Sequence, residues 1–168
     1  EELRSRIEDV FGLEKAERIE ITTFHGFGHA ALLRWESDLD KEFVILDESR
    51  QEELVFELLG RTDCDPILHL REPLETAREC VRQVTKLKER RISPDELEER
   101  IKEWEAAEPD KLLKHRESRA LLEIYRAYEA AKTEQNVVDF ADLINFTLDI
   151  LQSNPELVAE MRKQYKWV

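Results

Sequence analysis

Residues 137–151 read VVDFADLINFTLDIL. Asp139 is a good N-cap residue, and the apolar residues after it predict a helix that runs to Leu151. Asn154 and Pro155 then predict the start of one more helix, which ends near Tyr165. This part of the chain therefore indicates helices joined by short connections.

Three more helices are expected upstream of this segment. Apolar residues at helical spacing predict a helix from Leu74 to Arg91. Ser93 as a cap, Pro94 at the first helical position and acids in the first turn predict a second helix, which runs to Ala107. A third helix is expected from Lys111 to about Thr133. The second half of the chain is thus predicted to be helical throughout.

The first half of the chain is more mixed. The expected elements are an opening helix that carries Leu3, Ile7 and Val10, a short strand over 18–24, a turn over 25–28, a helix over 29–35, an extended run over 43–46, and a helix that begins after Asp47 and reaches Leu59. We therefore predict a mainly α fold: a multi-helix bundle with one or two short strands.

The composition excludes several classes of protein. The chain has 168 residues, with 41% apolar residues and a formal net charge of −13, so it can bury a core but does not coat nucleic acid or anionic lipid everywhere. No apolar run approaches the roughly 20 residues of a membrane span. Cys64 and Cys80 form no CxxC pair, which suits a reducing compartment, and we expect a cytoplasmic protein. The absence of a starting methionine and the apolar end suggest a piece of something longer.

Charge is unevenly distributed along the second half. Residues 78–91 hold six basic side chains against two acidic ones, and residues 92–110 hold eight acidic side chains against two basic ones. A solvated helix face is the ordinary explanation of such a charge cluster. A local site for phosphate groups is the alternative.

Two enzyme-like patterns fail on inspection. Gly26, Gly28 and Ala31, with Asp47 further on, mimic a dinucleotide-binding fingerprint, but no alternation of strands and helices follows to build the sheet. His25 and His29 lie one helical turn apart, but no third ligand lies close in sequence. A phosphate-binding loop of the GxxxxGKT type is absent from the 168 residues.

The segment from Thr22 to Phe27, TTFHGF, is a different kind of candidate. Two hydroxyls, an imidazole and free backbone N–H groups at one edge suit the binding of a phosphodiester backbone without reading the bases. By spacing alone the signal is weak, because Thr and His are common in ordinary turns.

Together, the segments EELRSRI at the start, TTFHGFGHAALLR at 22–34, VVDFADLINFTLDIL at 137–151 and the final residues 161–168 resemble the UvrD/Rep/PcrA-like superfamily 1 DNA helicases. Lys88 with Ile92, Ser93 and Pro94 resembles a further element of that family. The resemblance implies that 1–35 is the tail of motor domain 1A, 36–136 the helical domain 1B, and 137–168 the return to 1A.

The resemblance also implies roles for single residues. Thr23 and His25 are expected to contact the backbone of single-stranded DNA, and Phe24 and Phe27 to pack within their own domain. Asp139, Phe140 and Asp142 are expected to be structural, with Asp139 as the cap and Phe140 as the anchor of the following helix. The candidates for phosphate contacts beside the DNA are Lys86, Lys88, Arg90 and Arg91.

The parent protein implied by the resemblance is an ATP-dependent 3′–5′ DNA helicase of repair, replication or recombination. It would bind ATP and magnesium, DNA as a single strand and at a duplex junction, and its own domains 1A, 2A and 2B. This chain lacks the ATPase motifs, so we expect no catalytic residue, no metal site and no cofactor in it. The alternative is a helical protein-interaction module that docks a partner through the acidic helix 92–110 and Trp104.

Overall fold

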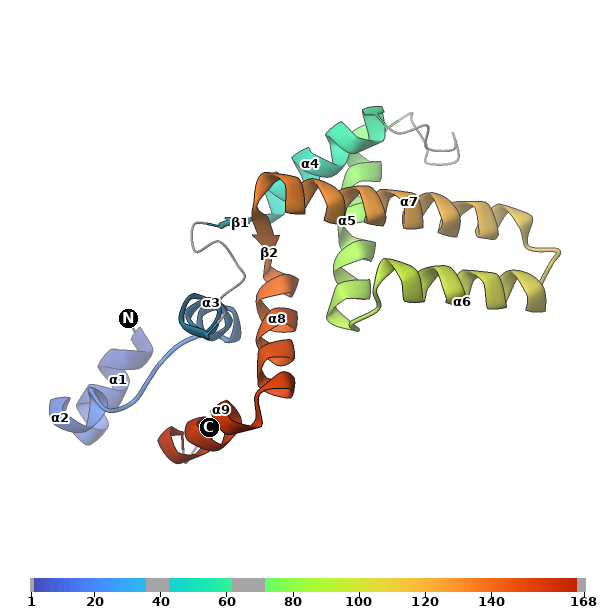
Figure 1. The fold of residues 1–168 in the computed structure, drawn as a ribbon. Helices are drawn as coiled ribbons and strands as arrows, with labels where there is room; N and C mark the ends of the chain where they lie inside the picture. Colours follow the sequence, from blue (N-terminus) through green and yellow to red (C-terminus); the bar gives the residue numbers. More distant parts are fainter. Residues whose placement is uncertain (1, 36–42, 62–71, 166–168) are drawn as a thin grey trace.

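The computed structural model describes residues 2–35, 43–61 and 72–165 (Figure 1). The elements in these ranges are α1 (Glu2–Phe11), α2 (Leu13–Ala16), α3 (Phe24–Trp35), β1 (Val44–Leu46), α4 (Glu48–Arg61), α5 (Pro73–Glu89), α6 (Pro94–Ala107), α7 (Leu112–Gln135), β2 (Val137–Asp139), α8 (Phe140–Ser153) and α9 (Pro155–Gln164). The predicted mainly α fold with one or two short strands is confirmed. Cys64 lies outside the described residues. No helix in these ranges is both long enough and apolar enough to cross a bilayer.

The two strands lie side by side and run parallel. Their register places Val44 opposite Val137 and Leu46 opposite Asp139. A parallel pair needs a crossover connection, and here the crossover consists of α4 to α7. The chain thus leaves β1 for a long helical excursion and returns in β2, next to its point of departure (Figure 1).

Each face of the strand pair joins a different apolar core, because successive side chains of a strand point to opposite faces. Leu46 and the half-buried Val137 belong to the larger core, which α4, α5 and α7 complete. Ile45 and Val138 belong to a smaller core that contains Leu32 of α3. The other buried members of the smaller core are Phe43 and Leu143.

The predicted helix starts at Ser93 and Asp139 are confirmed by their caps. The Ser93 hydroxyl accepts a hydrogen bond from the Glu96 N–H at 3.2 Å, and Pro94 follows at the first helical position. At the start of α8, the Asp139 side chain accepts from the Asp142 N–H at 3.0 Å, and the Asp142 side chain accepts from the Asp139 N–H at 2.9 Å. This reciprocal capping box satisfies two amide groups that the helix itself cannot.

The predicted strand over 18–24 and turn over 25–28 are wrong. The chain makes no strand there, and α3 begins at Phe24, so His25, Gly26 and Gly28 are helical. The Thr23 hydroxyl accepts from the Gly26 N–H at 3.0 Å, in the manner of an N-cap. A strand also needs a neighbour to accept its hydrogen bonds, and this segment has none among the described residues.

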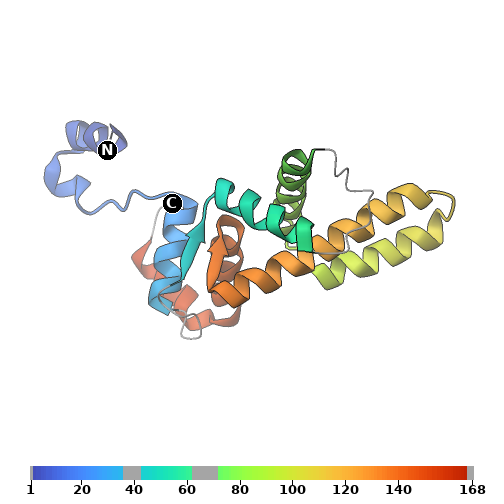
Figure 2. The same ribbon diagram turned by 90° about the horizontal axis from the view of Figure 1, so that it is seen from above.

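Two pairs of helices extend away from the cores. In Figure 2, α6 and α7 project together as a hairpin, and α1 with α2 lies apart at the other end of the molecule. Ion pairs between the two long helices hold the hairpin together, among them Arg119 with Glu105 and Arg126 with Glu98. The only buried residue of α1 and α2 is Ala16.

Gly28 allows α3 and α8 to approach closely. A Cβ at this position would lie 2.8 Å from the Leu143 carbonyl oxygen and 3.1 Å from the Thr147 hydroxyl. The Thr147 hydroxyl itself bonds to the Leu143 carbonyl at 2.6 Å, so it belongs to the same crowded crossing. The glycine pattern therefore serves helix packing rather than the binding of a pyrophosphate.

A group of charged side chains is buried where α5 and α7 meet the start of α8. We call these residues the buried ion cluster: Lys88, Glu129, Lys132, Asp139 and Asp142. The Lys88 ammonium lies 2.9 Å from Glu129, 2.6 Å from Asp139 and 2.5 Å from Asp142. The Lys132 ammonium lies 3.0 Å from Asp139 and 2.5 Å from Asp142. Two positive groups thus lie among three carboxylates.

These contacts determine the ionisation of the cluster. Burial alone would lower the pKa of Lys88, but the charges of Asp139, Asp142 and Glu129 outweigh it and the pKa is raised. Burial alone would raise the pKa of Asp139, but the charges of Lys88 and Lys132 lower it to about 2. The Tyr128 hydroxyl donates to the same Asp139 carboxylate at 3.1 Å. Lys88 and Asp139 are therefore both ionised at neutral pH.

Replacing Gly28 by Ala is expected to lower the free energy of unfolding of this chain by about 1–3 kcal/mol, because the new methyl group meets a backbone carbonyl that cannot move aside cheaply. Gly60→Ala is the matched control, since its Cβ would meet nothing within 4 Å. That variant should keep or gain up to ~1 kcal/mol. Urea unfolding followed by circular dichroism measures both, and equal effects would contradict the close crossing.

Lys88→Met is expected to lower the free energy of unfolding by about 3–5 kcal/mol, because it leaves buried carboxylates without one of their two cations. Lys86→Met, two positions earlier on the exposed side of α5, should change it by less than about 0.5 kcal/mol. The same urea titration compares the two variants. A small effect at Lys88 would show that the cluster is open to water.

Stability is also expected to depend on pH through Asp139. Its pKa is about 2 in the folded chain against an ordinary 3.8, so its contribution is fully present above about pH 5 and is lost as the pH falls toward 2. Between pH 5 and 2 the wild type should lose about 2 kcal/mol more than the Asp139→Asn variant. Asp95→Asn, at a side chain that is 91% exposed, should follow the wild type. Parallel curves for wild type and Asp139→Asn would contradict this assignment.

Candidate nucleic-acid interface

The first candidate residues lie at the start of α3. Thr22, Thr23 and His25 are all exposed, and Thr23 caps the helix. The absence of a side chain at Gly26 leaves room for the Thr22 hydroxyl, because a Cβ at position 26 would lie 2.6 Å from that oxygen. The positive end of the α3 dipole, two hydroxyls and an imidazole therefore share one exposed edge.

Aromatic rings extend this edge toward α8. The His25 ring meets the Phe140 ring edge-on, with centroids 5.2 Å apart and an angle of 65° between the planes. Phe140 is the first residue of α8 and is 42% exposed. Phe27 is half-buried, and its ring lies 6.2 Å from that of Tyr165. Phe24, in contrast, is 82% exposed, so within this chain it does not make the packing contact expected for it.

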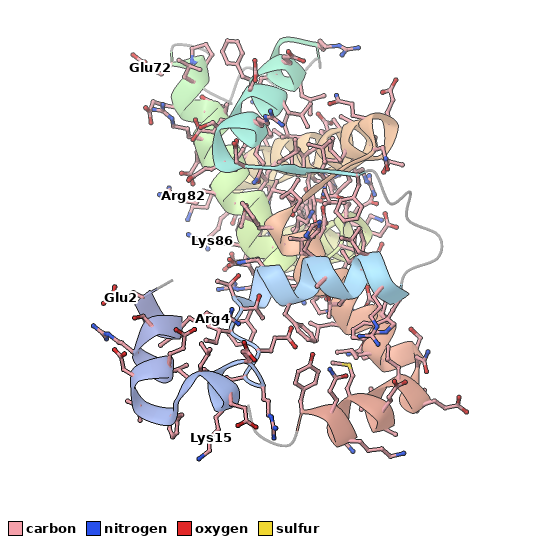
Figure 3. The ribbon with its side chains drawn as sticks, turned by 90° about the vertical axis from the view of Figure 1, so that its left-hand side faces the viewer. Glu2, Arg4, Lys15, Glu72, Arg82 and Lys86 are labelled. Carbon is pink, nitrogen blue, oxygen red and sulfur yellow. The ribbon has the colours of Figure 1, made fainter. Side chains whose placement is uncertain are left out.

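Of the four basic candidates, Lys86 lies on the exposed side of α5, and Arg90 is the exposed residue that caps its C-terminal end. They belong to a row with a spacing of four residues, which places side chains on one helix face. We call this row the α5 basic stripe: Arg78, Arg82, Lys86 and Arg90. Figure 3 shows Arg82 and Lys86 projecting from the same side of the helix. Arg78 and Arg82 were not predicted as site residues, although their spacing from Lys86 was visible in the sequence.

The stripe is only partly neutralised. Arg78 pairs with Glu52 and Glu75, and the hydrogen bonds and charges of these carboxylates raise its pKa. Arg82 pairs with Glu79. The pKa of Glu79 is lowered, chiefly by a hydrogen bond from Gln83; burial opposes this shift, and the charge of Arg82 adds to it.

The lower half of the stripe is open. Within the described part of the chain, Lys86 and Arg90 have no ion-pair partner. Both line a groove of about 220 Å³ between α5, α6 and α7, beside Ser118. These two side chains are therefore the available cations of the stripe.

Lys88 and Arg91 do not join the stripe. Lys88 is 4% exposed, and its three N–H groups are engaged by the buried ion cluster, so the structure does not support it as a phosphate contact. Arg91 has a left-handed backbone with a φ of 57°, and its side chain pairs with Asp149 of α8. The basic residues from 86 to 91 therefore lie in three different places: the α5 basic stripe, the buried ion cluster and the contact with α8.

A pocket connects the stripe with the aromatic pair. It has a volume of about 240 Å³ and lies between α4, α5 and the start of α8. Arg82 and Phe140 both line it, and Phe140 in turn contacts His25. The start of α3, the pocket and the α5 basic stripe therefore form a continuous surface.

Three carboxylates of the described residues lie close together, as they would in a metal site. Glu129, Asp139 and Asp142 come close enough together to hold a cation, but the ammonium groups of Lys88 and Lys132 already occupy that position. The sequence also has no phosphate-binding loop.

Several side chains of the acidic helix α6 are engaged by partners from the described part of the chain. Trp104 is half-buried, its indole N–H donates to Glu108 at 2.6 Å, and its ring lies 4.6 Å from that of His115. Arg119 and Arg126 of α7 pair with its acids. Part of this acidic helix is thus used to hold α6 against α7.

The chain is similar to known DNA helicases. The chain is similar to the ATP-dependent DNA helicase PcrA of Leuconostoc citreum, with 26% identity over 170 residues, which cover 99% of this chain and 20% of the helicase. It is similar to the ATP-dependent DNA helicase PcrA of Staphylococcus epidermidis, with 21% identity over 170 residues, covering 99% of this chain and 21% of that protein. The chain thus spans about one fifth of the length of these curated relatives.

The family described as the UvrD/REP helicase N-terminal domain matches residues 1–168, the whole chain. This match agrees in extent with the two relatives. The chain therefore belongs to the UvrD/REP helicase N-terminal domain family.

Proposed function

We propose that this chain guides DNA within an ATP-dependent 3′–5′ DNA helicase that acts in repair, replication or recombination. The observation that carries the proposal is the continuous surface from Thr23 and His25, past Phe140, to the α5 basic stripe. The PcrA relatives are ATP-dependent DNA helicases, which supports the same activity for the parent protein.

The proposed division of labour places the single strand at the start of α3. Thr23 and His25 contact its phosphates there, helped by the positive end of the helix dipole. Lys86 and Arg90 contact phosphates of the same strand on the other side of the pocket, toward the duplex junction. Their separation of one helical turn, about 6 Å along the axis, lets both reach one stretch of backbone.

The proposed domain division follows the strand pair. Residues 1–35 and 137–168 belong to motor domain 1A, and residues 36–136 form the helical domain 1B. The packing of α3 on α8 through Gly28 supports the first grouping, and the separate core of α4, α5 and α7 supports the second. ATP and magnesium bind elsewhere in the parent protein, which uses the energy of ATP hydrolysis to move this surface along DNA.

A protein-interaction module without DNA contact is less well supported. Trp104 is half-buried and its indole N–H is already engaged by Glu108, so it is not a free anchor for a second protein. The alternative remains distinguishable by experiment, because it predicts that DNA leaves the NMR spectrum of the chain unchanged at low salt.

Adding oligothymidylate at low salt is expected to shift the amide NMR signals of Thr23, His25, Lys86 and Arg90. Lys88 is an internal control: its buried ammonium has no free N–H, so the side-chain signal should not move. Binding should be weak and should fall steeply with salt, since the chain carries a net charge of −13. No shift at Thr23 and His25 would contradict the proposal.

Neutralising the two open cations tests the stripe separately. In Lys86→Gln/Arg90→Gln, the slope of log affinity against log salt should fall by about 1.4, because two phosphate contacts are lost. Arg162→Gln/Lys163→Gln removes the same charge from α9 and should leave the slope unchanged. Equal slopes for both double variants would show that only the net charge matters.

A further inference from the structure

The groove between α5, α6 and α7 combines two kinds of surface. Each helix contributes one half-buried leucine that packs against the larger core: Leu87, Leu97 and Leu121. The exposed cations Lys86 and Arg90 line the same groove and have no ion-pair partner in the described ranges. Because covering the remaining apolar area of the leucines is favourable, the groove suits a ligand that carries both negative charge and an apolar group.

A phosphodiester backbone matches only part of this surface. Its phosphates can pair with Lys86 and Arg90, but it has no N–H group to donate and no apolar side chain for the leucines. The groove also holds two acceptors of hydrogen bonds, the hydroxyl of Ser118 and the carbonyl oxygen of Gln83, whose amide N–H donates to Glu79 at 2.6 Å. An acidic peptide supplies all three complements: carboxylates, an apolar side chain and backbone N–H groups.

The spacing of the two cations fits a peptide in an extended conformation. Lys86 and Arg90 are four residues apart at the end of α5, which is about 6 Å along the helix axis. Alternate side chains of an extended chain point to the same side and lie about 6.6 Å apart. Carboxylates at two alternate positions can therefore reach both cations, and an apolar residue two positions further on lies on the same side. The groove, at about 220 Å³, has room for that side chain.

The charge of the whole chain makes such binding local. A net charge of −13 repels an acidic peptide in general. At physiological salt, exposed charges more than about 8 Å away are largely screened, whereas direct ion pairs persist. An acidic peptide is therefore held only where unpaired cations and apolar side chains occur together, as they do in this groove.

We propose that the groove between α5, α6 and α7 binds an extended acidic segment of a partner protein, and that this segment competes with DNA for Lys86 and Arg90. The segment carries carboxylates at two alternate positions and an apolar side chain two residues further on. The peptide site does not depend on DNA, but the competition rests on the proposed function, which assigns the same cations to phosphates. A bound partner thus weakens the hold of this surface on DNA.

The test measures binding of a labelled peptide that contains Glu-Ala-Glu-Ala-Leu, by fluorescence anisotropy. Replacing both Glu residues of the peptide by Gln, or its Leu by Ser, should each weaken binding about fivefold or more, since the first removes two ion pairs and the second an apolar contact. At low salt, unlabelled oligothymidylate should displace the peptide from the wild type.

Ser118→Leu separates the groove from its charge. The larger side chain fills the groove while Lys86 and Arg90 remain, so this variant should bind the peptide about fivefold more weakly and oligothymidylate like the wild type. Ser118→Ala is the matched control and should bind both ligands within about twofold of the wild type. Lys86→Gln/Arg90→Gln should weaken the binding of both. Circular dichroism and urea unfolding check that each variant keeps its fold.

The possible failures are distinguishable. Equal binding of the Glu and Gln peptides, or equal binding of the Glu peptide by the wild type and Ser118→Leu, would overturn the peptide site. A peptide that stays bound in the presence of an oligothymidylate that itself binds would overturn the competition. If oligothymidylate does not bind the wild type at low salt, the proposed function is wrong and the competition with it, whereas specific binding of the Glu peptide would still support the peptide site.

Discussion

Two lysine ammonium groups buried among three carboxylates hold this structure together at the point where its helices meet. Lys88 comes from α5, Lys132 from α7, and Asp139 and Asp142 from the start of α8. Charges are costly to remove from water, so they remain buried only while every partner stays in place. The cluster therefore fixes the start of α8 relative to the helical excursion, and with it the ring of Phe140.

The surface proposed to hold DNA depends on this joint and on a second constraint. Gly28 lets α3 approach α8 closely enough for the His25 ring to meet that of Phe140. The pocket between α4, α5 and α8 then brings Arg82 next to Phe140. Residues from three distant parts of the sequence thus share one face, although only His25 and Phe140 are in direct ring contact.

Local signals predicted much of the fold. Ser93 with Pro94, and Asp139 with its apolar followers, marked helix starts because capping involves residues only three positions apart. The strand expected over 18–24 failed because alternating Ile and Thr residues make a strand only beside a partner strand, and the Thr23 hydroxyl instead caps α3.

The candidate site was predictable only in part. In the sequence, Lys88 could not be told apart from the exposed basic residues next to it. One of the carboxylates that it pairs with, Asp142, lies 54 residues away along the chain. Lys86 and Arg90 differ from it only in the helix face they occupy, which their spacing of four could have indicated. No local pattern in the sequence indicated the contact between the His25 and Phe140 rings.

The parallel pair of β1 and β2 brings the two ends of the helical excursion together. The chain departs after Leu46 and comes back at Val137, opposite Val44, while the tip of the α6–α7 hairpin lies far from this joint (Figure 2). Lengthening the α6–α7 hairpin would alter how far the arm extends without disturbing its base. The length of the α6–α7 hairpin can therefore change during evolution while the helices at its base keep their positions.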